Sequence, residues 1–164
     1  MTDPFSALQF GFRKKVPVVL QVEAAECGLA CLAMIMAYHG HKIDLATLRR
    51  RYSVSIQGVT LRSLVQIADN SGFSTRAVRL DMDDLANLKK PCILHWGMNH
   101  FVVLTEVNGK KVMINDPAVG HRTLDMAEVS REFTGVALEA TPNENFEQKD
   151  ERETIRLRDL FRHV

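Results

Sequence analysis

The sequence predicts an α+β fold with an N-terminal helical lobe and a C-terminal lobe built on an antiparallel β-sheet. Before Gly72 the apolar residues recur at helical spacing, and after it they alternate as in strands. The Asn108-Gly109 pair between two of the later apolar runs is typical of a tight β-hairpin. Helices followed by antiparallel strands are the element order of an α+β domain.

The composition predicts one domain with short ends. Its 164 residues, 46% of them hydrophobic, suffice for one core but not for two large domains. The net charge of +1 gives no reason to expect a nucleic-acid partner. No apolar run approaches the ~18 residues that span a bilayer. The cysteines are odd in number, and Cys27 and Cys31 are badly placed on one helix to bond, so we expect a reducing compartment.

The first long helix is predicted to begin close to Cys27. Strong helix formers follow this residue, and Gly40 is suited to the left-handed conformation that ends a helix. The segment before it, residues 16–20, contains a proline and β-branched residues and is expected to be extended.

Later elements are predicted from capping residues and from alternation. Asp44 and Thr60 are suited to cap the next two helices, and Asp125 with Glu128 forms a capping-box pattern before a short one. The expected helices span 45–52, 61–70 and 125–133, with a short helical turn over 81–88. The expected strands span 73–80, 92–96, 100–107, 110–115, 122–124 and 135–141.

After residue 141 the composition becomes polar. Residues 142–153 are rich in Asn, Glu, Gln, Lys and Asp, which predicts a solvated connector with too little apolar content to pack. Residues 154–164 place Leu and Phe at helical spacing, which predicts the start of an amphipathic helix. We therefore place the domain at residues 1–141 and assign residues 142–164 to the connector and this helix.

Cys27 is the candidate nucleophile. At the start of a helix, unpaired backbone N–H groups and the helix dipole both favour a thiolate over a thiol. Cys31 lies one turn further along, within an apolar run, where burial as inert packing is expected. A helix start supplies no base, so the position of Cys27 alone leaves both catalysis and packing open.

His100 and Asp116 are the candidates for a base and for the group that orients it. They lie at facing ends of the two strands joined by Asn108-Gly109, so a hairpin would bring them together. A strict two-residue loop at that pair would send His100 to the face opposite Asp116. We therefore predict either a loop with an odd number of residues or a β-bulge in this hairpin.

Gln21 is the candidate donor to an oxyanion. Acyl transfer builds negative charge on a carbonyl oxygen, which a side-chain amide and the backbone N–H of Cys27 would stabilise together. Considered alone, Gln21 is better explained as an ordinary polar residue at the end of an extended segment.

A zinc site is an alternative for part of this set. Cys27 and Cys31, together with His95 and His100, have the formal spacings of a Cys2His2 site. The stretch between the two pairs is several times longer than the ~12–15 residues of a zinc finger. We therefore expect no metal site here.

The motifs along residues 15–141 resemble those of the peptidase family C39 domain, the N-terminal part of ABC transporters that export bacteriocins and microcins. The residues that carry the resemblance are, in order, Gln21, Glu26-Cys27-Gly28, Cys31, His95-Trp96, Asn99-His100-Phe101 and Asn115-Asp116-Pro117-Ala118. The resemblance implies a papain-like cysteine protease with Cys27 as nucleophile and His100 as base and acid. Asp116 is then the orienting group and Gln21 the oxyanion donor.

The resemblance also implies a substrate and partners. The expected reaction is cleavage of a bacteriocin or microcin leader peptide directly after a double-glycine motif, coupled in the full-length exporter to ATP-driven export. The expected partners are that leader and the transmembrane and nucleotide-binding domains of the same exporter. The domain itself is expected to be soluble, at the cytoplasmic side of the bacterial inner membrane. No cofactor is implied for it, because ATP and magnesium belong to the nucleotide-binding domain. The alternative is a leader-binding module without catalysis.

Overall fold

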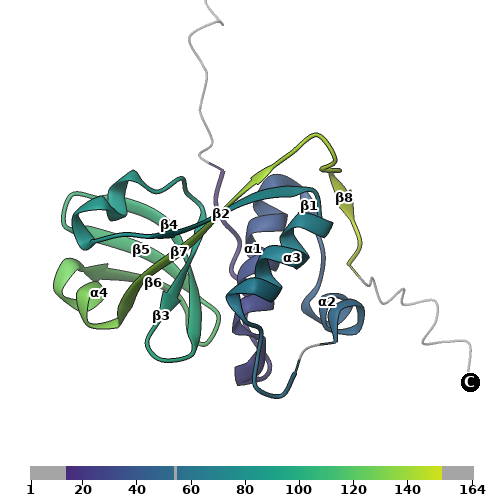
Figure 1. The fold of residues 1–164 in the computed structure, drawn as a ribbon, viewed down its shortest axis with the longest axis horizontal. Helices are drawn as coiled ribbons and strands as arrows, with labels where there is room; N and C mark the ends of the chain where they lie inside the picture. Colours follow the sequence, from purple (N-terminus) through teal and green to yellow (C-terminus); the bar gives the residue numbers. More distant parts are fainter. Residues whose placement is uncertain (1–13, 54, 153–164) are drawn as a thin grey trace, which may run out of the picture.

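The computed structural model describes residues 14–53 and 55–152. The helices of the first half of the chain lie on one side, and the sheet lies on the other together with the last helix (Figure 1). The helices and 3-10 turns are η1 (Ala24–Glu26), α1 (Cys27–His39), α2 (Leu45–Tyr52), α3 (Leu61–Asn70), η2 (Met82–Asn87) and α4 (Met126–Glu132). The strands are β1 (His41–Lys42), β2 (Phe73–Arg79), β3 (Cys92–Trp96), β4 (His100–Asn108), β5 (Lys111–Asp116), β6 (Gly120–Asp125), β7 (Phe133–Pro142) and β8 (Lys149–Asp150). The predicted α+β class is confirmed. The predicted helix over 154–164 lies outside the described residues.

The predicted capping residues end and begin the helices of the first lobe. Helix α1 begins at Cys27, and Gly40 ends it with a φ of 105°, a conformation that glycine adopts without strain. The side chains of Asp44 and Thr60 accept hydrogen bonds from the first turns of α2 and α3. Every residue of α1 from Cys27 to Met36 is buried, so this helix is a rigid support for its first residue.

The six-stranded sheet is antiparallel, in the order β2-β7-β3-β4-β5-β6. Strand β7 lies between β2 and β3, so the last long strand returns to the middle of the sheet. In β4, Phe101 and Val103 join the hydrophobic core around α1, whereas Val102 and Leu104 join a second core on the side of α4. This alternation follows from the period of two in a strand, and it makes the central strands the boundary between the two cores.

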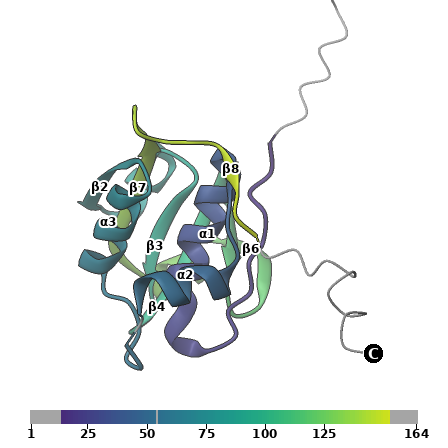
Figure 2. The same ribbon diagram turned by 90° about the vertical axis from the view of Figure 1, so that its right-hand side faces the viewer.

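The segment after β7 differs from the prediction of a solvated connector. Strand β8 pairs in parallel with β1, and the Phe146 ring lies 4.9 Å from the ring of Phe73. Figure 2 shows this last described segment running beside the helical lobe. The prediction that residues 142–153 do not pack is therefore wrong for the described residues 142–152. The Phe146 ring and the backbone pairing of β8 attach this segment to the helical lobe. Among the described residues, no helix is both long and apolar enough to cross a membrane.

Candidate active site

Cys27 lines a cleft of about 640 Å³ between the helical lobe and the sheet. One wall is the η1 turn together with Tyr52, Ser53 and residues 55–60, between α2 and α3. The other wall is the end of the β3–β4 hairpin, with His95, Asn99 and Phe101. Only 4% of the Cys27 surface is exposed, so the sulfur lies at the floor of the cleft.

The other two cysteines are packing residues. Cys31 and Cys92 are completely buried. Burial raises the pKa of the Cys31 thiol well above its ordinary value and the pKa of the Cys92 thiol to about 12. Both therefore remain protonated at neutral pH, as inert core cysteines do.

The hairpin of β4 and β5 contains the predicted bulge. Asn108 pairs with Lys111, so the turn between them consists of Gly109 and Lys110. The register of β4 against β5 then shifts between Leu104 and Glu106. The extra residue of the bulge compensates for the even-numbered turn. His100 and Asp116 consequently lie on the same face of the ladder.

The structure brings His100 and Asp116 into contact. His100 Nε2 lies 2.7 Å from Asp116 Oδ1, which also accepts a hydrogen bond of 2.9 Å from the backbone N–H of Ala118. Asp116 Oδ2 lies 3.6 Å from a guanidinium nitrogen of Arg122 on the neighbouring strand β6. The carboxylate is thus oriented from three directions, and it fixes the histidine ring in turn.

The surroundings of His100 favour its charged form. Its hydrogen bond with Asp116 and then its interaction with the Cys27 side chain raise its pKa to about 9, against a partial opposing effect of burial. Burial by itself would raise the pKa of Asp116, but its contacts with His100, Ala118 and Arg122 lower it. Because Nε2 is engaged by Asp116, Nδ1 is the ring nitrogen left to face the sulfur of Cys27.

Gln21 is joined through its backbone to the strand end that carries Asp116. Its backbone N–H donates a 2.9 Å hydrogen bond to the carbonyl of Pro117, directly after Asp116. Its side-chain oxygen is buried and has no hydrogen-bond partner among the described residues. A buried amide oxygen that the fold does not satisfy is uncommon, and such groups are often found at sites that bind a ligand.

Sequence reasoning missed the groups that support these four residues. Arg122 was expected only as part of an edge strand, although the β5–β6 register places it diagonally opposite Asp116. In the sequence, Glu26 stands out only as a neighbour of Cys27, and Arg49 only as one member of the run Arg49-Arg50-Arg51. The two form an ion pair between η1 and α2. Pairing Asp116 with Gly120 around a short turn would have predicted Arg122, whereas no local signal predicts the contact of Arg49.

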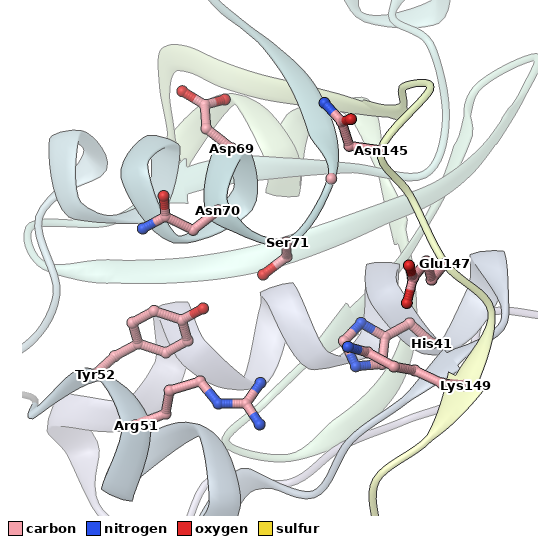
Figure 3. A pocket seen from close by; sticks show the side chains of 10 residues that line it. His41, Arg51, Tyr52, Asp69, Asn70, Ser71, Asn145, Glu147 and Lys149 are labelled. Atoms are coloured by element: carbon pink, nitrogen blue, oxygen red, sulfur yellow. The ribbon is translucent and has the colours of Figure 1, made fainter.

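A separate cavity lies outside this cleft in the described part of the chain. Within residues 14–53 and 55–152, no group of three His, Cys, Asp or Glu side chains is arranged to hold a metal ion. A polar cavity of about 320 Å³ lies between the ends of α2 and α3 and the segment 145–149 (Figure 3). None of the four candidate residues lines it.

Known proteins that resemble this chain are longer exporters. A probable microcin secretion/processing ATP-binding protein of Escherichia coli, MchF, is 46% identical over 157 residues, which are 96% of this chain and 22% of that protein. The colicin V secretion/processing ATP-binding protein CvaB of Escherichia coli has the same identity and coverage. The chain therefore spans about a fifth of the length of the curated relatives it matches.

Solved structures of peptidase domains have the same fold. The crystal structure of a double glycine motif protease from an AMS/PCAT transporter in complex with the leader peptide superposes with a TM-score of 0.75 and 41% identity, over 80% of this chain and 94% of that one. The peptidase domain of Streptococcus ComA gives a TM-score of 0.72 and 28% identity, over 79% of this chain and all of that one. The model of the Peptidase C39 family matches residues 15–145. The family predicted from the motifs is confirmed, and the chain belongs to the Peptidase C39 family.

Proposed function

We propose that the chain is a papain-like cysteine endopeptidase that removes a leader peptide from a bacteriocin or microcin precursor by cutting directly after a double-glycine motif. The observation that carries the proposal is the arrangement of Cys27, His100 and Asp116, with the sulfur at the floor of an open cleft. A similar chain of known structure is a double glycine motif protease bound to its leader peptide, which supports the substrate class.

The first half-reaction forms a thioester. Transfer of the Cys27 proton to His100 gives the imidazolium that this site favours, and the thiolate sulfur then attacks the carbonyl carbon of the second glycine. The carbonyl oxygen becomes an oxyanion, which the Gln21 side-chain amide and the backbone N–H of Cys27 stabilise. The C–N bond then breaks as the imidazolium of His100 gives its proton to the leaving amine, which releases the mature peptide.

The second half-reaction restores the cysteine. His100 takes a proton from a water molecule, and the resulting hydroxide oxygen attacks the thioester carbon. The C–S bond breaks, the leader leaves with a new carboxyl group, and the Cys27 sulfur recovers its proton from His100. Asp116 reacts at no stage, because its role is to hold the ring orientation and to support the positive charge.

The walls of the cleft suit an amphipathic leader. Two glycines offer no side chain to recognise, so affinity has to come from contacts on other leader residues. Ile56 is 98% exposed at the rim, and Val59, Leu61 and Phe101 add apolar surface inside the cleft. An amphipathic helix with apolar residues at i, i+3, i+4 and i+7 is the shape that such a surface accommodates.

In the full-length protein we place this domain at the cytoplasmic side of the bacterial inner membrane. The relatives that it matches are named as secretion/processing ATP-binding proteins, and this chain spans only about a fifth of their length. The remaining partners would be transmembrane and nucleotide-binding domains that use ATP and magnesium for export. The proposed peptidase reaction uses side chains of this chain, the backbone N–H of Cys27 and water.

Incubation of the domain with a leader peptide that contains a double glycine, followed by mass spectrometry of the products, tests this function. We expect a single cut after the second glycine, and Cys27→Ala should abolish the cut while leaving peptide binding nearly intact. Binding of the leader to the wild-type domain without any cleavage would contradict the peptidase and indicate a leader-binding module.

A further inference from the structure

We propose that Glu26 is the positioning residue of the oxyanion hole and that Arg49 holds it in place, an inference that rests on the proposed function. Glu26 directly precedes Cys27 and is only 2% exposed. Its Oε2 accepts hydrogen bonds of 3.1 Å from the backbone N–H groups of Val22 and Glu23, and its Oε1 forms an ion pair with the Arg49 guanidinium.

These bonds fix the backbone on the far side of Gln21. The N–H of Val22 belongs to the peptide group that follows Gln21, and Glu26 holds it. The N–H of Gln21 itself belongs to the preceding peptide group, and the Pro117 carbonyl holds that one at 2.9 Å. With both flanking peptide groups fixed, the direction in which the Gln21 side chain leaves the backbone is fixed as well.

The same carboxylate connects both oxyanion donors. One donor is the Gln21 amide, and the other is the backbone N–H of Cys27, which follows Glu26 without an intervening residue. A change at Glu26 therefore moves the two donors relative to each other. Because an oxyanion hole works through preorganised donors, a small misplacement lowers the rate without removing any group that contacts the substrate.

Arg49 offsets the charge that this arrangement introduces. Burial by itself would raise the pKa of Glu26, but the N–H groups of Glu23 and Val22 and the guanidinium of Arg49 lower it overall, so the carboxylate is ionised at neutral pH. A buried carboxylate without a charged partner would be costly to the fold. Arg49, on the facing surface of α2, both neutralises that charge and ties the η1 turn to a second helix.

Helix α2 supplies a matched control. Two residues after Arg49, Arg51 forms an ion pair of 3.1 Å with Glu151, and Arg51 lines the polar cavity of Figure 3 rather than the catalytic cleft. Glu151 also contacts His41 Nε2 at 3.0 Å and Lys149 Nζ at 3.2 Å. Glu151→Gln therefore removes a carboxylate that pairs with an arginine of the same helix and with two further residues, without touching the turn from Gln21 to Cys27. It measures what the loss of these contacts costs when no oxyanion donor is involved.

The test measures kcat and KM on a double-glycine leader peptide at 25 °C, with folding checked by circular dichroism. We expect Glu26→Gln to lower kcat about tenfold with KM within about twofold, because displacing a donor costs less than the ~10²-fold or more of deleting one. Glu151→Gln should leave kcat unchanged, and Arg49→Lys should retain more activity than Arg49→Met. If Glu26→Gln does not fold, kcat of Arg49→Met is measured in its place, and we expect the same loss of about tenfold.

A double-mutant cycle separates positioning from general stability. In a Gln21→Ala background, Glu26→Gln should cause a much smaller further loss, because one of the two donors that it positions is already absent. Equal losses of kcat in both backgrounds, or a wild-type kcat in Glu26→Gln, would overturn this inference alone, provided that cleavage still requires Cys27. Cleavage that survives Cys27→Ala would instead overturn the proposed function.

Discussion

His100 Nε2 lies 2.7 Å from Asp116 Oδ1, although the two residues are 16 positions apart in the chain. The β-bulge between Leu104 and Glu106 makes this contact possible, because a regular ladder continuing from the observed turn would put the two side chains on opposite faces. The contact occupies Nε2 and leaves Nδ1 for Cys27. In the reaction that we propose, the hairpin therefore decides which ring nitrogen exchanges a proton with the sulfur.

Asp116→Ala should shift the alkaline limb of the pH dependence of kcat/KM. The protonated ring must donate to the leaving amine, so activity falls as His100 loses its proton, near pH 9 in the wild type. Without the Asp116 hydrogen bond, the pKa of His100 should move toward its ordinary value, about 6.5. We expect a loss of ~10²-fold at pH 8 with measurable residual activity, because the nucleophile and base remain.

Arg122→Met is the matched control for this experiment, since Arg122 touches the same carboxylate at 3.6 Å without contacting His100 in the ladder. In Arg122→Met, the alkaline limb of the pH dependence of kcat/KM should shift from its wild-type position much less than in Asp116→Ala. An unchanged limb in Asp116→Ala, or a loss as complete as that of Cys27→Ala, would show that the carboxylate does not act through the imidazole.

The His100 interaction should also make folding stability depend on pH. Its pKa is raised in the folded chain, so the stabilisation is fully present below about pH 6.5 and is lost as pH rises through about 9. The shift corresponds to at most about 3 kcal/mol. Urea unfolding of the wild type and of His100→Ala between pH 6 and pH 10 measures it. The difference between their unfolding free energies should shrink toward high pH, and a constant difference would refute the assignment.

Iodoacetamide should label Cys27 well before the other two cysteines at neutral pH. Cys27 lines the open cleft, whereas Cys31 and Cys92 are completely buried and their pKa values are raised. Peptide mapping after short exposure measures the order. The Cys27→Ala chain should take up almost no label on the same timescale, and earlier labelling of Cys31 would argue against a reactive thiolate at the helix start.

The sequence predicted those parts of the fold and site that depend on local signals. The start of α1 at Cys27, its end at Gly40 and the need for a bulge follow from capping, propensity and the period of two in a strand. The return of β7 to the middle of the sheet was not predicted, because strand order depends on contacts between distant segments. The Glu26–Arg49 ion pair was not predicted, for the same reason. The run of three arginines in the sequence does not reveal which of them faces a carboxylate.

Removing the segment after Thr141 should destabilise the helical lobe. The Phe146 ring packs against Phe73 and His39, and β8 pairs with β1. A chain ending at Thr141 should therefore unfold at lower urea concentration than one ending at Arg152, and Phe146→Ala alone should cost ~1–3 kcal/mol. Cleavage by the folded protein should change little, because Cys27 begins α1 whereas this segment contacts His39 at the other end of the helix. Equal stability of the two chains would instead support a domain boundary at 141.

Detection of a thioester between Cys27 and the leader tests the central claim most directly. The wild-type domain is mixed with a double-glycine precursor peptide, quenched in acid within one turnover, and examined by intact-protein mass spectrometry. The account predicts a species with the mass of the protein plus the leader less one water, mapped to Cys27, and neither adduct nor cleavage in Cys27→Ala. Undiminished cleavage by the Cys27→Ala chain would contradict it.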